Sequence, residues 1–125
     1  TRSLDRRIYN HMVVHHSDLD DDALDRQFKA LADATRRDIL RRTLAGPSNV
    51  SDLAAHYAMS FAAVQKHVAV LESAGLVHKT PSGRQRLVNA DPDQLARAQA
   101  ALAQLESLWR HRITMLDDIL AEPKE

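Results

Sequence analysis

From residue 95 to residue 119, apolar side chains recur every seven residues, and this repeat constrains the fold more than any other feature of the chain. One position of the repeat holds Leu95, Leu102, Trp109 and Leu116, and the other holds Ala98, Leu105, Arg112 and Ile119. Arg112 is the single residue that interrupts the apolar pattern, and the neighbouring Ile113 can take its place. The repeat predicts one continuous helix. Asp91 is its expected N-cap, Pro92 its first helical residue, and Gln94 the partner in a capping box.

The length of this helix sets a condition on what it packs against. Nearly 30 residues at about 1.5 Å per residue span roughly 40 Å, which exceeds the size of a compact domain of about 90 residues. We therefore expect part of the apolar seam to lie against a second copy of the chain. The alternative is a helix that packs wholly within its own monomer.

The part of the chain before residue 75 is predicted to form four shorter helices. Leu24, Phe28 and Leu31 mark one face of the first, which begins near Asp20. The N-cap residues expected for the next three helices are Asp33, Asn49 and Ser60, and their ends are expected at Gly46–Pro47, Tyr57–Met59 and Gly75.

Two short stretches rich in branched residues follow, Leu76–Thr80 and Arg84–Asn89, and the turn signal Pro81–Gly83 separates them. They predict a hairpin whose tip is made basic by Lys79, Arg84 and Arg86. The expected fold class is mainly α with a small β-hairpin wing: a winged helix-turn-helix with a long C-terminal helix for dimerisation.

The 125 residues suit one domain. We expect it over residues 20–122, with its C-terminal dimerisation helix from about residue 91, an N-terminal extension over residues 1–19 and a tail over residues 123–125. His11–Met12 is also what a cloning site leaves. Either Met12 is the native start or residues 1–11 are native.

The net charge of zero conceals an uneven distribution of charge. Residues 35–90 carry eight basic and three acidic side chains, a net charge of +5. Residues 1–34 carry five against seven, and residues 91–125 carry four against seven. The middle of the chain, with the predicted helix pair and hairpin, is thus the part suited to DNA.

The fourth predicted helix carries the side chains expected to read DNA. Val64, Val68 and Leu71 form its buried stripe, so polar residues off that stripe near its N-terminus face outward. The predicted contacts are Ser60 and Gln65 to bases, Lys66 to a phosphate and Phe61 to a thymine methyl, with Ala62 beside them on the same surface. Lys79, Arg84 and Arg86 of the wing are expected to reach the adjacent backbone or the minor groove.

Two segments resemble the signatures of ArsR-type (ArsR/SmtB) bacterial transcriptional regulators. Residues 28–40 (Phe-Lys-Ala-Leu-Ala-Asp-Ala-Thr-Arg-Arg-Asp-Ile-Leu) resemble the family's opening motif, and residues 60–77 resemble its recognition helix and the entry to its wing. The resemblance covers about residues 22–120. It implies a homodimeric winged-helix repressor or regulator that binds an imperfect palindrome in double-stranded DNA and releases it when an inducer binds. The sequence identifies neither that inducer nor whether binding represses or activates.

The resemblance also implies the positions of two further sets of contacts. His67 stands in the family's Lys-His pair, next to the DNA. The first and last helices build the dimer, which assigns to it Leu24, Phe28, Leu102, Leu105, Trp109, Leu116 and Ile119.

The chain departs from the family pattern in its recognition helix. Family members often have Gln where Phe61 stands, Ser at Gln65 and a basic residue at Ala69, so the operator of a relative is not expected to transfer. The absence of cysteine excludes the thiolate sensing of arsenite, cadmium or lead that some family members perform.

Histidine and carboxylate ligands give only weak metal candidates. His111, Asp118 and Glu122 lie roughly on one face of the last predicted helix, but the family's two-histidine spacing is missing. A solvated helix face is the alternative. His11, His15 and His16 form a second cluster, which we interpret as tail composition. No metal and no cofactor are expected.

Other functional classes find little support. The chain has no Gly-rich phosphate loop and no nucleophile elbow, so we do not expect an enzyme. It has no apolar run of about 18 residues and no visible signal peptide, so we expect a soluble, cytoplasmic protein with no membrane partner. Two alternatives to a DNA-binding repressor stay open: a winged-helix protein-interaction module that has lost DNA binding, and a repressor that responds to metal through histidine and carboxylate ligands.

Overall fold

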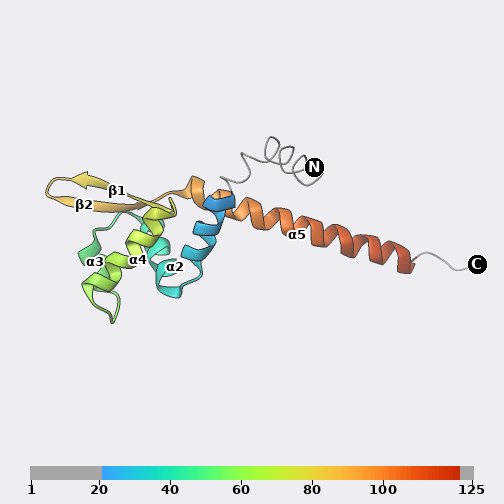
Figure 1. The fold of residues 1–125 in the computed structure, drawn as a ribbon, viewed down its shortest axis with the longest axis horizontal. Helices are drawn as coiled ribbons and strands as arrows, with labels where there is room; N and C mark the ends of the chain where they lie inside the picture. Colours follow the sequence, from blue (N-terminus) through green and yellow to red (C-terminus); the bar gives the residue numbers. More distant parts are fainter. Residues whose placement is uncertain (1–20, 122–125) are drawn as a thin grey trace, which may run out of the picture.

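A computed structural model describes residues 21–121 and confirms the mainly helical fold with a hairpin wing (Figure 1). The first helix covers residues 21–31. The elements after it are α2 (Ala34–Ala45), α3 (Val50–Ala54), α4 (Phe61–Ser73), β1 (Val77–Ser82), β2 (Gln85–Ala90) and α5 (Pro92–Ala121). The extension and tail expected over residues 1–19 and 123–125 lie outside the described part.

Side-chain hydrogen bonds cap the N-termini of the helices at the residues that the sequence predicts. The side chains of Asp33, Asn49 and Ser60 accept the backbone N–H groups of Arg36 at 3.0 Å, Asp52 at 2.7 Å and Ala63 at 3.1 Å, respectively. Asp91 caps α5 in the same way, accepting from the backbone of Asp93 and Gln94. At the end of α4, Gly75 has a φ of 78°, the left-handed conformation expected of a residue just past a helix.

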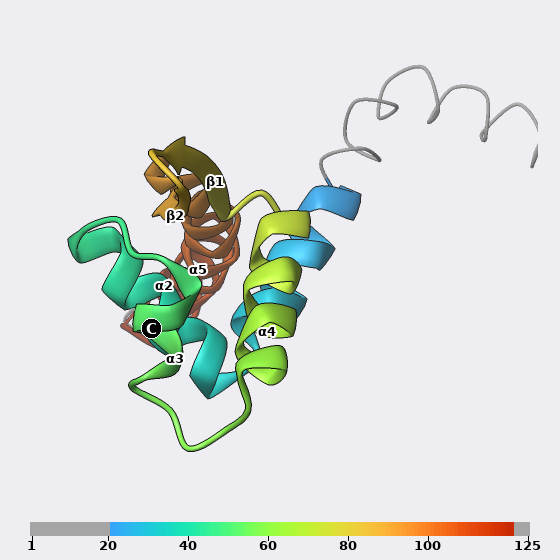
Figure 2. The ribbon, with the colours of Figure 1, turned by 90° about the vertical axis from the view of Figure 1, so that its left-hand side faces the viewer.

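The core lies where α2, α3 and α4 meet the base of the hairpin. Its largest fully buried apolar side chains are Ile39, Leu53, Val64, Val68, Leu71, Leu76, Val77 and Val88. Figure 2 shows α4 running beside the first helix, with α3 on the other side of the body. The hairpin and α5 leave this body in opposite directions (Figure 1).

Two boundaries differ from the sequence prediction. Helix α3 ends at Ala54, before the end expected at Tyr57–Met59, so residues 55–60 join it to α4. The hairpin turn is Gly83–Arg84, because Ser82 pairs with Gln85, and the expected turn at Pro81–Gly83 is wrong. Gly83 adopts a φ of 62°, which a two-residue hairpin turn requires and glycine tolerates.

The predicted capping box is also wrong. The backbone N–H of Asp91 donates to the carbonyl of Leu76 at 2.8 Å, so it does not need the side chain of Gln94. That side chain instead accepts a hydrogen bond from Gln27 at 3.0 Å. A further unpredicted contact is an antiparallel bridge between Ser48 and Val88, which fixes the hairpin to the segment between α2 and α3.

Most of the apolar seam of α5 is exposed in the monomer. Ala98 is its one buried residue, whereas Leu105 is 63% exposed and Trp109 58% exposed. The described residues of one monomer therefore leave the seam uncovered. Within residues 21–121, no helix combines the length and the apolar character needed to cross a membrane.

Candidate nucleic-acid interface

The first two turns of α4 present the residues predicted to contact DNA. Gln65 and Lys66 are exposed, as are Phe61 and Ala62, while Val64 on the opposite face is fully buried. The Ser60 hydroxyl oxygen accepts from the backbone of Ala63, and its proton stays available to donate. Packing thus fixes the helix by one face and leaves the other face of its N-terminal half open.

His67 occupies the edge of this surface. It is half-buried, and its Nδ1 lies 3.3 Å from Nη1 of Arg36 in α2. The side chain therefore contacts the neighbouring helix, whereas the side chains of Gln65 and Lys66 have no hydrogen bond or ion pair within residues 21–121.

The tip of the wing carries two free arginines. Arg84 lies in the turn and Arg86 lies opposite Pro81 on β2, and both side chains are exposed. Neither has an ion-pair partner among residues 21–121. Such unpaired guanidinium groups suit contact with phosphate or with a narrow minor groove.

Lys79 does not join the two arginines at the tip. It pairs with Val88 within the hairpin, and its Nζ lies 3.9 Å from Oε1 of Glu72 near the end of α4. Its side chain is only 24% exposed. The sequence placed Lys79 at the tip because the turn was predicted too early.

Polar contacts at both ends hold the hairpin in place. Asn49 donates from Nδ2 to the side-chain oxygen of Gln85 at 3.2 Å, which ties the wing to the start of α3. Nε2 of His78 lies 2.7 Å from Oδ2 of Asp91, which ties the base of the wing to the start of α5. The hydrogen bond with His78 lowers the pKa of the Asp91 carboxyl.

Comparison with known proteins places this surface in a family. Residues 31–80 match a model described as a helix-turn-helix domain. The chain is 40% identical over 90 residues to the HTH-type transcriptional regulator Rv2034 of Mycobacterium tuberculosis, covering 72% of this chain and 81% of that protein. A crystal structure of an ArsR family transcriptional regulator is 35% identical with a TM-score of 0.66, covering 71% of this chain and 92% of the other.

The chain belongs to the ArsR family. An ArsR-like transcriptional regulator from Rhodococcus sp. RHA1 has the same fold, with a TM-score of 0.70 and 29% identity over 82% of this chain and 95% of the other. The ArsR-family chain is thus a winged helix-turn-helix, DNA-binding transcriptional regulator, as residues 28–40 and 60–77 predicted. Its relatives are regulators, a non-enzymatic kind of protein.

Four arginines of this regulator's basic segment are engaged within the fold, which the charge count did not reveal. Arg36 donates to the carbonyls of Ala30 at 2.7 Å and Lys29 at 3.1 Å. Arg37 likewise donates to Leu31 at 2.8 Å. They satisfy the carbonyls at the end of the first helix, and only the tertiary structure shows it.

The other two arginines pair with Asp38. Arg41 lies 2.9 Å and Arg42 2.8 Å from its carboxylate, at i+3 and i+4 on α2. This spacing was readable from the sequence as a pair of helical ion pairs. Within residues 35–90, the basic side chains with no hydrogen bond or ion pair to the described residues are therefore Lys66 on α4 and Arg84 and Arg86 at the wing tip.

Tyr57 links the turn before α4 to α2 through the same aspartate. Its hydroxyl donates to Oδ2 of Asp38 at 2.6 Å. This hydrogen bond, with that from Arg42, lowers the pKa of Asp38, while burial and the same hydrogen bond raise the pKa of Tyr57 to about 12. The helix-turn-helix of the regulator is thereby fastened to the helix behind it.

The residues considered for metal binding do not form a ligand set within the described part of the chain. His111 and Asp118 are exposed on α5, and Glu122 lies outside the described residues, as do His11, His15 and His16. Across residues 21–121, no three histidine, aspartate or glutamate side chains come together as a ligand set.

Proposed function

We propose that this regulator is a dimeric repressor whose two α4 helices enter successive major grooves of a palindromic operator. The observation that carries the proposal is the exposed face of α4, with Gln65 and Lys66 standing free while Val64 and Val68 anchor the opposite face. A helix held in this way can present hydrogen-bonding side chains to base edges. The glutamine amide suits adenine, and the lysine suits a phosphate.

The wing supports the same orientation. Arg84 and Arg86 are exposed beyond the helix pair and have no carboxylate partner within residues 21–121. In the proposed complex they contact the backbone or minor groove beside the half-site that α4 occupies. Phe61, 47% exposed at the start of α4, supplies an apolar contact for a thymine methyl.

The exposed seam of α5 supports a dimer. Leu102, Leu105, Trp109, Leu116 and Ile119 are each at least 50% exposed. An apolar stripe at seven-residue spacing is stabilised when it packs on a matching helix. Leu24 and Phe28 of the first helix are half-buried, and they extend the proposed interface. A two-fold dimer would place the half-sites about one helical turn, roughly 34 Å, apart.

We also propose where the protein acts and how its binding to the operator is controlled. A regulator of bacterial type acts in the cytoplasm, where its DNA lies. Release of the operator follows binding of an inducer. We propose no metal cofactor.

Fluorescence anisotropy with the promoter region of the regulator's own gene tests the function. We expect saturable binding that resists competitor DNA and weakens as salt increases. Gln65→Ala should reduce the difference in affinity between this DNA and its base-substituted variants by about tenfold, since a bidentate base contact contributes about 1–3 kcal/mol of discrimination. Gln99→Ala, at an exposed position of α5, is the matched control.

Binding that competitor DNA abolishes, or that does not depend on salt, would contradict the proposal. That result would favour the protein-interaction module considered from the sequence. Unchanged base discrimination in Gln65→Ala would remove this residue from the proposed readout.

A further inference from the structure

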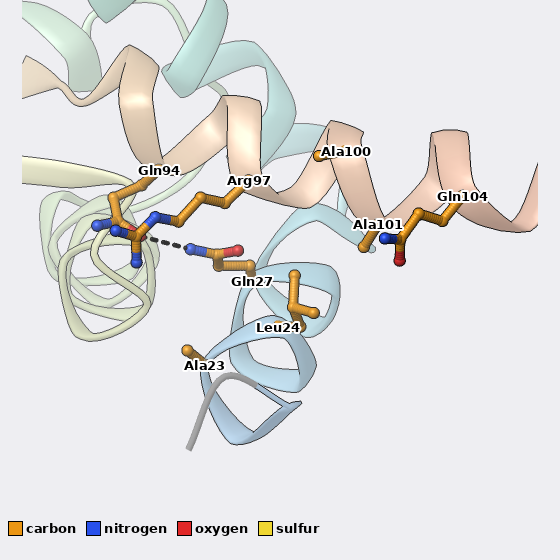
Figure 3. A pocket seen from close by; sticks show the side chains of 8 residues that line it. All are labelled: Ala23, Leu24, Gln27, Gln94, Arg97, Ala100, Ala101 and Gln104. Atoms are coloured by element: carbon orange, nitrogen blue, oxygen red, sulfur yellow. Dashed lines mark hydrogen bonds between the residues drawn. The ribbon is translucent and has the colours of Figure 1, made fainter. Parts of the chain in front are cut away.

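The first helix, residues 21–31, has two unlike sides. Leu24 and Gln27 lie on the side that faces α5, with a cavity between the two helices (Figure 3). Leu24 also belongs to the proposed dimer interface, so a second copy of the chain covers that side. Arg26 and Lys29 follow Leu24 by two and five positions, which places them about 200° and 140° around the helix from it. They therefore lie on the side that the proposed dimer leaves open.

This second side of the first helix faces α4 across a hollow of about 450 Å³. Arg26 and Lys29 line the hollow from the first helix, and Ala69, Val70 and Ser73 line it from α4. In Figure 2 the two helices run beside each other. The short side chains of Ala69 and Ser73 leave room on the α4 side, so a group from outside can enter between the helices.

The α4 wall of the hollow continues the surface that is proposed to face DNA. Lys66, Val70 and Ser73 are spaced at i, i+4 and i+7, so they lie on one face of α4. Lys66 and Ser73 are exposed and Val70 is 38% exposed, whereas Val68 on the opposite face is fully buried. The hollow therefore opens beside the face of α4 that carries Lys66.

Two cationic side chains of the hollow are available to an anion. Arg26 and Lys29 are exposed, and neither side chain makes an ion pair or a hydrogen bond within residues 21–121. Arg36 also lines the hollow, but its guanidinium group already donates to two carbonyls at the end of the first helix. Arg36 thus adds positive charge, while Arg26 and Lys29 supply the donors.

The acidic residues nearby lie outside the hollow. Asp22 and Asp25, one turn earlier on the first helix, do not line it and pair with neither of its two exposed cations. Glu72 is the one acidic residue of α4, and its Oε1 lies 3.9 Å from Nζ of Lys79 in the wing. With no carboxylate among the described residues that line it, the hollow favours an anionic partner.

We propose that Arg26 and Lys29 bind phosphates of the operator, so that the DNA contact extends from α4 to the first helix. The inference rests on the proposed function. A major groove is about 12 Å wide, and a helix inside it has a phosphate backbone on either side. The first helix borders one side of α4, and its two cations meet the backbone there. Their exposure beside the face of Lys66 suits a long polyanion rather than a small enclosed ligand.

Fluorescence anisotropy of the full chain over a range of salt concentrations tests this contact, with the promoter region of its own gene and a random duplex as the two probes. Arg26→Gln and Lys29→Gln should each make the slope of log K against log salt less steep by about two, because each removes one phosphate contact per protomer. The double variant should lose about four. At about 0.1 M salt, each single substitution should weaken both DNAs equally, by about tenfold or more.

Two further variants separate a phosphate contact from a structural effect. Lys29→Arg keeps the charge and should keep the affinity and the slope of the unchanged chain. Arg110→Gln removes an exposed arginine of α5 outside the hollow and should leave both values unchanged. Because Arg26 and Lys29 are exposed, circular dichroism of their variants should show the helical content of the unchanged chain.

The possible results distinguish this contact from the repressor on which it rests. A double variant with the slope of the unchanged chain would overturn the phosphate contact, including the case in which the hollow takes a small anion instead. A loss of affinity confined to the promoter DNA, or an equal loss in Arg110→Gln, would overturn it as well. An unchanged chain without salt-sensitive DNA binding would overturn the proposed repressor, and this contact with it.

Discussion

At the scale of single residues, Arg36 joins three elements. Its guanidinium bonds two carbonyls at the end of the first helix and contacts His67 of α4. Its position in the sequence motif indicated a family resemblance, and the structure supplies a physical reason for an arginine there. Few other side chains could satisfy two carbonyls and reach a neighbouring helix at once.

We predict that Arg36→Ala lowers the free energy of unfolding by about 2 kcal/mol, because hydrogen bonds from a charged group contribute about 1.5–3 kcal/mol. Urea denaturation measures the change. Arg41→Ala is the control, since the Arg41 side chain is 73% exposed in its pair with Asp38 and should cost about 0.5 kcal/mol or less. Equal effects of the two substitutions would contradict the role assigned to Arg36.

Three carboxyls give the fold a dependence on pH. The pKa values of Asp33, Asp38 and Asp91 are all lowered, mainly by hydrogen bonds from Arg36, Tyr57 and His78, respectively. A group whose pKa is lower in the folded state stabilises the fold above its unfolded pKa. That stabilisation is lost as pH falls through the folded pKa.

We therefore predict that the melting temperature is level above about pH 5 and falls as the pH drops below about 4. Asp38→Asn should reduce the size of this fall. Asp52→Asn is the control, because the carboxylate of Asp52 accepts no hydrogen bond within residues 21–121. A melting temperature that is constant down to pH 2, or a larger fall in Asp38→Asn, would show that these hydrogen bonds do not govern acid stability.

At the scale of elements, the sequence predicted what depends on near neighbours. The caps at Asp33, Asn49, Ser60 and Asp91 join residues two or three positions apart, and all four are confirmed. The exposed face of α4 was predictable for the same reason, since helical periodicity alone separates its buried and outward residues.

Contacts between distant residues were not predictable. The bond between Gln27 and Gln94 joins residues 67 positions apart, and the Ser48–Val88 bridge replaces an expected loop. Both depend on how the elements pack. Lys79 was misplaced because a two-residue turn at Gly83 lengthens the strands on either side and moves the tip beyond it.

The exposed seam of helix α5 should be the surface that holds two copies of the chain together. Leu105→Glu puts a charge into the exposed seam, and we expect the dimer to dissociate while the helical content stays unchanged, because Leu105 is 63% exposed in the monomer. Sedimentation equilibrium and circular dichroism measure the two properties. Ser107→Glu places the same charge on an exposed position outside the seam and should remain dimeric.

A Leu105→Glu protein that sediments like the unchanged chain would contradict the proposed interface. Loss of the dimer in Ser107→Glu would also contradict it, because the effect would then not depend on the seam.

At the scale of the whole molecule, the hairpin and α5 extend from opposite ends of one helical body (Figure 1). Within residues 35–90, the basic side chains without a partner among the described residues lie on α4 and the wing tip, while the apolar seam lies on α5. Net charge is therefore a poor guide to function here: the total is zero because α5 and the N-terminal residues are acidic. The internal pairing of Arg41 and Arg42 reduces the basic surface further.

The salt dependence of operator binding in Arg84→Ala tests the DNA-facing surface most directly. Each phosphate contact contributes a slope of about −0.9 to log K against log salt, so a dimer that loses one contact per protomer should have a slope less steep by about two. Its affinity should fall similarly for all DNA sequences, and Arg110→Ala should match the unchanged chain. An affinity and slope in Arg84→Ala equal to those of the unchanged chain would show that the wing tip does not contact the DNA.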